Sequence, residues 1–237
     1  MGTPSRLYKY LPSGFVETLV ERGDLFLRNL AYFRKIEDKG RNDLLEGLHM
    51  DRPHNPITLQ TLDGKALWRG RAAFLNSINA NDVFVFCLSE VLSESLFQEF
   101  MVDACVEIVD PCEFIQRCDA MVRTQSCFSE SGLLHGSVEY YAPHQPVRGD
   151  VTNGRMIPFF KHESYSHQGE YRLVVAIKCG LQLTRRIVND LFTFDDEVTS
   201  GIEGSQHILI GSIRDIVKVH LFSKPAVESS ASPEAAP

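Results

Sequence analysis

The sequence predicts a single α+β domain, and three observations support this fold class. Short apolar runs bounded by turn residues indicate about six to eight strands, and amphipathic stretches indicate about three to five helices. The two kinds of segment do not alternate strictly, which favours a mixed or antiparallel sheet over a doubly wound parallel one. No internal repeat or change of composition divides the chain, and 237 residues with 43% hydrophobic side chains can bury one large core.

The domain boundaries follow from the composition of the two ends. Residues 1–5 are expected to be a frayed start, and residues 6–223 to form the single domain. Residues 224–237 consist largely of Ser, Ala, Pro and Glu without a hydrophobic pattern. This composition predicts a disordered tail.

The first elements are a strand, a helix and a second strand. The stretch "RLYKYLP" predicts a short strand that ends at Pro12. The stretch "SGFVETLVERG" predicts a helix that Ser13 caps and Gly23 ends. The stretch "DLFLRNL" then predicts a strand with Leu25 and Leu27 on the same face.

An unusually charged segment follows. Residues 34–46 hold four basic and four acidic side chains among 13. This density is typical of a solvated helix and turn held by ion pairs. A segment of this kind between apolar strands can also line a cleft and hold a polar ligand, so Arg41, Asp43 and Glu46 are candidate cleft residues.

The middle of the chain contains two strands and two helices. Residues 51–81 are rich in loops, with a hairpin expected around Asp63 and Gly64. The stretch "VFVFCLSE" predicts a buried strand, and "SESLFQEFM" predicts a short helix. A strand over residues 104–109 is followed by a helix that begins after Asp110, with Pro111 in its first turn.

The last third is expected to contain further strands and one helix. Residues 136–141 predict a strand, "IPFFKHESY" a short strand or turn, and "EYRLVVAI" a strand. The stretch "RRIVNDLF" predicts a helix. The stretch "HILIGSIRDIVKVHLF" predicts a strand, a short turn or helix, and a final strand.

Composition restricts the function classes. The formal net charge of −7 argues against a general affinity for nucleic acid, although a local basic groove stays open. No secretory leader and no apolar run of membrane-spanning length is present, so we expect a cytoplasmic protein without a membrane partner. The six cysteines show no C-x-x-C spacing and are expected to be reduced and mostly buried.

Common catalytic and cofactor motifs are missing. The sequence contains no P-loop, no G-x-G-x-x-G, no G-x-S-x-G and no H-E-x-x-H. The stretch "KHESYSH" places His162 and His167 five residues apart around Glu163, which fits no standard ligand spacing. We therefore expect no metal site.

Glu170 is the most informative polar residue. It stands directly before an apolar run, with Gln168 two residues ahead of it and Arg172 two residues behind. Side chains two apart in a strand share a face, so Glu170 and Arg172 can pair with each other or with neighbours on adjacent strands. A carboxylate held rigidly at the start of a buried strand can also be catalytic. The residues alone leave both interpretations open.

Four segments in this order resemble a widespread family of uncharacterised bacterial proteins. They are "LYKY" at 7–10, "YFRKIEDKGRNDLLEG" at 32–47, "FCLSE" at 86–90 and "QGEYRLVV" at 168–175. Many relatives carry a Phe-Asn-Asp-Pro turn in the second segment, where this chain has a charged version. The resemblance spans roughly residues 6–222 and depends on the order of the four segments.

That family is in turn distantly similar to ADP-ribosyltransferases. The similarity implies a split core of two small sheets around a cleft for NAD, with NAD as substrate. Gln168 and Glu170 match the Gln/Glu-x-Glu element, and Ser89 matches the serine of the second strand. Lys9 stands where an Arg or His is expected on the first strand, with Arg6 as a nearby substitute.

The resemblance also implies roles for these side chains. Glu170 would stabilise the oxocarbenium-like transition state as the bond between nicotinamide and ribose breaks. Gln168 would orient the acceptor or a water, Ser89 would bind the ribose or support Glu170, and Lys9 would pair with a phosphate. The stacking candidates for the nicotinamide ring are Tyr8, Tyr10 and Tyr165.

The residues and the resemblance together lead to two candidate functions and to a third that ranks below them. The first is an NAD-dependent ADP-ribosyltransferase of the toxin or phage-defence kind, with a protein or nucleic acid acceptor and an antitoxin or regulatory partner. The alternative is a non-enzymatic ligand-sensing or protein-interaction module in bacterial defence, in which Glu170 and Arg172 form a structural pair. The third, a metal-dependent nucleic-acid-processing enzyme that uses the acid-rich segment, lacks a recognisable ligand spacing.

Overall fold

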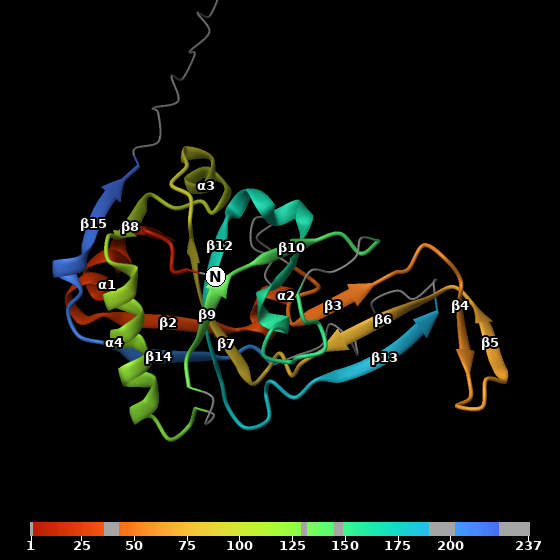
Figure 1. The fold of residues 1–237 in the computed structure, drawn as a ribbon. Helices are drawn as coiled ribbons and strands as arrows, with labels where there is room; N and C mark the ends of the chain where they lie inside the picture. The colour runs from red at the N-terminus through yellow and green to blue at the C-terminus, as the bar shows by residue number, and fades with distance from the viewer. Residues whose placement is uncertain (1, 36–42, 129–131, 145–148, 190–201, 223–237) are drawn as a thin grey trace, which may run out of the picture.

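The computed structural model describes residues 2–35, 43–128, 132–144, 149–189 and 202–222 (Figure 1). In these ranges the fold is α+β, with four α-helices, fifteen strands and mostly antiparallel sheets. The strand count exceeds the predicted six to eight. The helices are α1 (Val16–Arg22), α2 (Leu30–Lys35), α3 (Glu94–Glu99) and α4 (Pro111–Thr124). None of the described helices has the length and apolar character needed to cross a membrane.

An eight-stranded sheet forms the centre of the molecule. Its strands are β1 (Leu7–Leu11), β2 (Asp24–Asn29), β7 (Val83–Ser89), β8 (Ala104–Ile108), β9 (Leu134–Ser137), β12 (Glu170–Ala176), β14 (Ser205–Leu209) and β15 (Val217–Leu221). Strand β7 is the axis of this sheet, because β12 pairs with it antiparallel along its whole length. The predicted buried strands "VFVFCLSE" and "EYRLVVAI" therefore lie side by side (Figure 1).

The other edge of β7 is shared by two strands that do not meet. Strand β2 pairs with β7 only at Val85 and Phe84, and β1 pairs with it only at Ser89. Between these contacts, neither β2 nor β1 lies opposite Phe86, Cys87 or Leu88 in the described chain. The sheet is consequently split along this edge of β7, with β2 and β14 on one side and β1, β8 and β15 on the other.

Alternation along the strands divides the core between the two faces of this sheet. On one face, Leu25 and Leu27 pack with Phe84 and Phe86 under helix α4, as the alternation in "DLFLRNL" predicted. The other face of the same strands carries Val85, which packs with residues of α2 and β12. Side chains at Arg28, Cys87 and Glu170 therefore emerge on the face opposite to α4.

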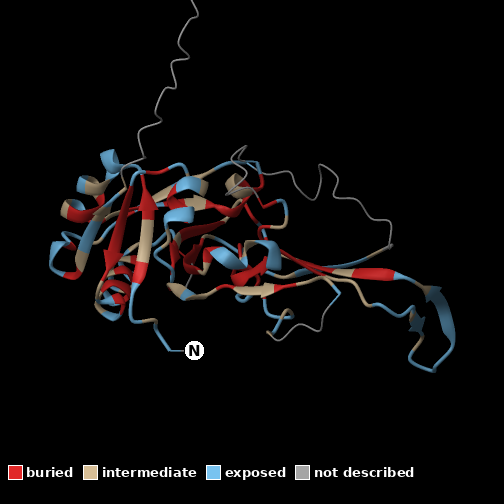
Figure 2. Ribbon diagram, turned by 90° about the horizontal axis from the view of Figure 1, so that it is seen from above, coloured by how far each residue is buried: buried red, intermediate tan, exposed pale blue. Residues whose placement is uncertain are grey.

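Three smaller sheets surround the central one. They are a three-stranded sheet of β13 (Thr184–Asn189), β6 (Ala72–Ser77) and β3 (Leu48–Asp51), the parallel pair β10 (Glu139–Tyr141) and β11 (Phe160–His162), and the hairpin β4 (Ile57–Gln60) with β5 (Ala66–Gly70). The hairpin projects from one end of the molecule, and its residues are largely exposed (Figure 2). Its turn holds Gly64 at φ +88°, which confirms the hairpin expected there.

Several local predictions need correction. The expected helix "RRIVNDLF" is wrong over Thr184–Asn189, which forms β13 and pairs with β6 along six residues. The rest of that stretch lies outside the described residues. Ser13 does not cap a helix, because its backbone N–H and its hydroxyl both bond to the Asp103 carboxylate. Gly23 does end α1, at φ +58°.

Residues 51–81, which were expected to be rich in loops, hold the strands β4, β5 and β6, and the other predicted elements hold with small changes of boundary. Asp110 caps α4 by accepting from the Glu113 N–H, with Pro111 as the first residue of the helix. The strand expected over 136–141 is two strands, β9 and β10, which belong to different sheets. Residues 2–5 form no helix or strand, and the predicted disordered tail at 224–237 lies outside the described residues.

Candidate functional site

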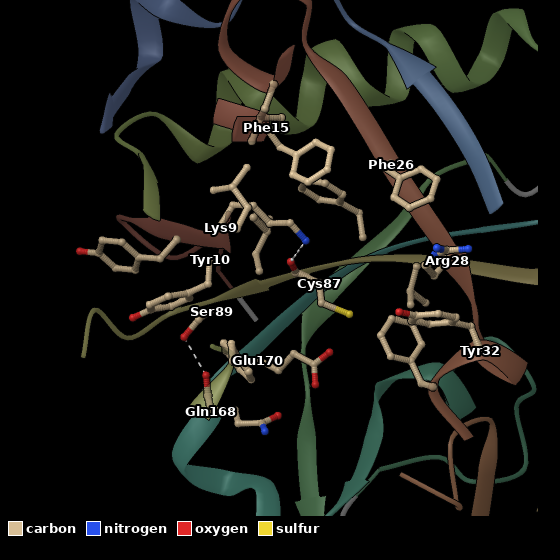
Figure 3. A pocket seen from close by; sticks show the side chains of 18 of the residues that line it. Lys9, Tyr10, Phe15, Phe26, Arg28, Tyr32, Cys87, Ser89, Gln168 and Glu170 are labelled. Atoms are coloured by element: carbon tan, nitrogen blue, oxygen red, sulfur yellow. Dashed lines mark hydrogen bonds between the residues drawn. The ribbon is translucent and has the colours of Figure 1, made fainter. Parts of the chain in front are cut away.

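A pocket of about 690 Å³ occupies the split in the central sheet. Its walls come from β1, β2, β7 and the start of β12, together with residues before α1 and on α2 (Figure 3). Aromatic side chains provide much of the lining: Tyr8, Tyr10, Phe15, Phe26, Tyr32, Phe33, Phe86 and Phe100. Lys9, Ser89, Gln168 and Glu170, which were predicted from three separate segments, all border this one pocket.

Glu170 is held by two cations at the inner end of the pocket. Arg172 donates from Nε to Glu170 Oε1 at 2.8 Å and from Nη2 to Oε2 at 3.1 Å. Lys161 Nζ donates to Oε2 at 3.0 Å. The Glu170 side chain is only 7% exposed, and its backbone N–H donates to the Tyr140 hydroxyl at 2.8 Å. The predicted pairing of Glu170 with Arg172 is therefore real.

Arg172 connects Glu170 to the charged segment at the beginning of the chain. Its Nη1 and Nη2 donate to Glu46 Oε2 and Oε1 at 2.9 and 2.6 Å, and Nη1 also donates to the Pro158 carbonyl at 2.6 Å. Arg172 is 1% exposed, and Glu46 is 2% exposed. Glu46, Lys161, Glu170 and Arg172 thus form one buried network of two anions and two cations.

The network keeps the Glu170 carboxyl ionised. Burial alone raises the pKa of Glu170, but the opposing charges of Arg172 and Lys161 and their hydrogen bonds lower it well below its usual range. Burial lowers the pKa of Lys161, and the charges of Glu170 and Glu46 more than reverse that effect. Both groups are charged at neutral pH. Glu170 is therefore suited to electrostatic stabilisation rather than to proton transfer.

The Cys87 thiol is an uncharged group beside Glu170. It lies on β7 opposite Arg172, borders the pocket and lies near the Glu170 carboxylate. Burial, followed by the charge of Glu170, raises the pKa of this thiol, so it remains protonated. A carboxylate offers about four acceptor positions. Arg172 and Lys161 occupy three of those of Glu170.

Three charged residues in the described ends of the charged segment are buried beside this site and do not form a solvated face. Arg34 is 6% exposed, Asp43 3% and Glu46 2%, so the solvated interpretation is wrong for these three. Arg34 Nε donates to the Glu46 carbonyl at 2.6 Å. Burial and the nearby Glu46 charge raise the pKa of Asp43 to about 6. Arg41 lies outside the described residues.

Lys9, Ser89 and Gln168 shape the pocket through bonds to its backbone and to the network. Lys9 Nζ lies 4.1 Å from the centre of the Phe86 ring and donates to the Cys87 carbonyl at 2.9 Å, on the strand edge that the split exposes. The Ser89 hydroxyl donates to the Gln168 carbonyl at 2.7 Å (Figure 3). The Gln168 amide accepts from Lys161 at 3.1 Å and donates to Glu99 at 2.8 Å.

The tyrosines that were predicted to stack on the nicotinamide ring border two different pockets. Tyr8 and Tyr10 border the main pocket, but the Tyr10 hydroxyl donates to the Val91 carbonyl and the ring is packed against Phe97. Tyr165 does not line the main pocket. It borders a smaller hollow of about 250 Å³ beside Asp43, with its ring 4.6 Å from Lys161 Nζ.

Sequence reasoning missed three contributors to the site. Lys161 and Cys87 complete the shell around Glu170, and Arg28 enters the pocket from β2. The alternation that placed Leu25 and Leu27 in the core could have placed Arg28 on the opposite face. Nothing in the sequence pointed to Lys161. In the described ranges, no group of three or more His, Cys, Asp and Glu side chains is placed to hold a metal ion.

Comparisons with known proteins provide no family for the chain. No protein-family model, no curated protein and no solved structure matches it.

Proposed function

We propose that the chain is an ADP-ribosyltransferase that binds NAD in the pocket at the split of the central sheet. One observation carries the proposal. Ser89 and Glu170 match two elements of the resemblance, Lys9 stands at the position of the Arg or His of the other element, and these three residues, far apart in the sequence, border one pocket. The split of the sheet along β7 also agrees with the divided core that the resemblance implies.

The dimensions and lining of the pocket support a dinucleotide ligand. A volume of about 690 Å³ lies within the range of small-molecule sites, and such sites combine an apolar lining with a few fixed polar groups. Aromatic rings offer stacking surfaces for a nicotinamide and an adenine. Lys9 and Arg28 add positive charge for the phosphates of NAD.

The surroundings of Glu170 determine its part in the reaction. Loss of nicotinamide leaves positive charge on the ribose, and a fixed, ionised carboxylate next to it stabilises that charge. Arg172 and Lys161 hold Glu170 in place, and the Cys87 thiol lies beside it. A hydroxyl is a stronger donor than a thiol. We therefore assign the ribose hydroxyl to the acceptor position of Glu170 that Arg172 and Lys161 leave open.

A ligand-sensing or interaction module without catalysis is the second candidate, and one observation favours it. Three hydrogen bonds from Arg172 and Lys161 engage the Glu170 carboxylate, and the charges of the network balance. A carboxylate neutralised by two cations stabilises positive charge less than a carboxylate with one side open to the ligand. In this function the pocket binds its ligand, and Glu170 only maintains the pocket.

Release of nicotinamide from NAD separates these two functions. We expect the wild-type protein, incubated with labelled NAD in the presence and absence of a bacterial lysate, to release nicotinamide. Glu170→Gln is expected to abolish the release, while Glu113→Gln on the outer surface of α4 leaves it unchanged. The lysate supplies a protein or nucleic acid acceptor. Label that is transferred from NAD to protein or to nucleic acid identifies the class of the acceptor.

The folding of the variants has to be measured beside their activity. Glu170→Gln leaves Arg172 and Lys161 with one carboxylate fewer, so its melting temperature must show that it remains folded at the assay temperature. A folded Glu170→Gln protein that releases nicotinamide at the wild-type rate contradicts the transferase. NAD that raises the melting temperature of a wild-type protein without any turnover supports the sensing module.

A further inference from the structure

Arg28 occupies the part of the pocket formed by β2. Alternation along this strand places Asp24, Phe26 and Arg28 on the pocket face, while Leu25 and Leu27 are buried in the core below. Strand β2 and strand β12 lie on opposite edges of β7. Arg28 and Glu170 therefore enter the pocket from opposite sides of that strand (Figure 3).

Two aromatic rings hold the Arg28 guanidinium. Its central carbon lies 4.6 Å from the centre of the Phe26 ring and 4.3 Å from the centre of the Tyr32 ring. Contacts of this kind are cation–π interactions, which cover the face of the planar group and leave its N–H edges free to donate. The rings thus fix a half-buried cation before any ligand arrives, which lowers the entropy lost on binding.

Arg28 differs from the other cations of the pocket in its partners. Lys161 is bonded to Glu170, and Lys9 donates to the Cys87 carbonyl. The nearest acidic residue on the same face of β2, Asp24, is paired with His207 at 2.7 Å. Across the ranges that the structure describes, Arg28 forms no ion pair and no hydrogen bond, so its N–H donors face the pocket without an acceptor from the protein.

We propose that Arg28 binds the phosphate groups of a nucleotide ligand in this pocket. A guanidinium presents two parallel N–H groups that match two phosphate oxygens, and a charge-assisted pair of this kind is stronger than a neutral hydrogen bond. The surrounding aromatic rings suit the base of the same ligand. The inference rests on the proposal that the pocket holds a nucleotide, and it requires no transfer reaction.

Binding of ADP and of adenosine tests the role of Arg28 without any turnover. Isothermal titration compares both ligands on the wild-type protein, on Arg28→Gln, on Arg28→Lys, and on Arg155→Gln as a control at an exposed position outside the pocket. We expect wild type to bind ADP about tenfold or more tightly than adenosine. Arg28→Gln should remove this difference by weakening ADP alone, Arg28→Lys should keep part of it, and Arg155→Gln should keep all of it.

Three results overturn the inference: equal affinity of wild type for ADP and adenosine, unchanged ADP affinity in Arg28→Gln, or no binding of ADP at millimolar concentration. Melting temperatures establish that each variant is folded, and Arg28→Lys provides the second variant if Arg28→Gln is not. The result of this binding experiment can be distinguished from the result for the transferase proposal. Arg28-dependent ADP binding without release of nicotinamide supports this inference and contradicts the enzyme, whereas nicotinamide release with unchanged ADP affinity in Arg28→Gln does the reverse.

Discussion

Replacing Arg172 by methionine is expected to destabilise the protein severely. Methionine keeps the length and apolar stem of the side chain but removes the guanidinium that joins Glu170 to Glu46. The change deletes four charge-assisted hydrogen bonds to carboxylates and one to the Pro158 carbonyl. Lys161 remains as the only cation bonded to the two buried carboxylates among the described residues.

The size of the loss follows from the burial of the partners. Removing one member of a buried ion pair costs about 3 to 5 kcal/mol, because the other member stays buried without its counter-charge. Two carboxylates, both largely buried, lose Arg172 at once, while Lys161 lies 3.0 Å from Glu170 and 3.8 Å from Glu46 and compensates in part. We therefore expect a loss of about 4 kcal/mol in the free energy of unfolding.

Urea unfolding at pH 7.5 and pH 5 measures this loss. Without Arg172 the folded-state pKa of the buried carboxyls rises above its unfolded value, so protonation stabilises the folded variant at the lower pH. The deficit of Arg172→Met relative to wild type should consequently shrink at pH 5. Arg117→Met serves as the matched control, since Arg117 pairs with the exposed Asp215 and its loss should matter much less.

Two outcomes would refute this account of the network. One is a loss for Arg172→Met below about 1 kcal/mol, the size typical of an exposed ion pair. The other is additive losses when Arg172→Met and Glu46→Gln are combined, since residues in one hydrogen-bonded network show coupling of about 0.5 to 3 kcal/mol.

Three further predictions concern single side chains and glycines. Cys87→Ala should retain nicotinamide release because it adds no donor beside Glu170, whereas Cys87→Ser should reduce release because its hydroxyl, a stronger donor than the thiol, competes with the ribose for the carboxylate. Burial lowers the pKa of His49 to about 4, and both of its ring nitrogens lack a hydrogen bond within the described chain. The unfolded chain takes up that proton near pH 6.5, so wild type should lose up to about 3 kcal/mol between pH 6.5 and pH 4 relative to His49→Phe, measured by urea unfolding. Gly23→Ala should destabilise far more than Gly64→Ala in thermal melts, because both glycines have positive φ but only at Gly23 would a Cβ meet a backbone oxygen, that of Gly211.

Each of these predictions has a contrary result. Equal activity of Cys87→Ser and Cys87→Ala would show that a hydroxyl at position 87 does not compete with the ribose for Glu170. Parallel pH–stability curves for wild type and His49→Phe would show that His49 takes up its proton at the same pH in the folded and unfolded chains. Equal melting temperatures of Gly23→Ala and Gly64→Ala would show that the contact at Gly23 relaxes without cost.

The central strands could be predicted from the sequence because their own residues dictate them. The runs around Val85 and Val174 are apolar on both faces, which only a buried strand satisfies. The alternation in β2 likewise placed Leu25 and Leu27 correctly. The resemblance implied a split core, but the place of the split could not be predicted, because it depends on where β1 and β2 each meet β7, and those pairings join residues far apart in the chain.

The errors arose where distant partners override local pattern. In residues 184–189, Ile187 and Val188 fit an amphipathic helix, but pairing with β6 makes this stretch a strand. The charged segment was expected to face solvent because the sequence does not show which residues pair with it. Glu46 pairs with Arg172, which lies 126 residues further along the chain. Glu170 was found as a site residue, whereas Lys161 could be found only from the structure.

A crystal structure of the protein with a non-hydrolysable carba analogue of NAD tests the central claim most directly. We expect the dinucleotide in the split of the sheet, with the hydroxyls of the nicotinamide ribose within hydrogen-bonding distance of Glu170. An analogue that binds elsewhere on the surface, or a pocket that stays empty at saturating concentration, would contradict the assignment of this pocket to NAD.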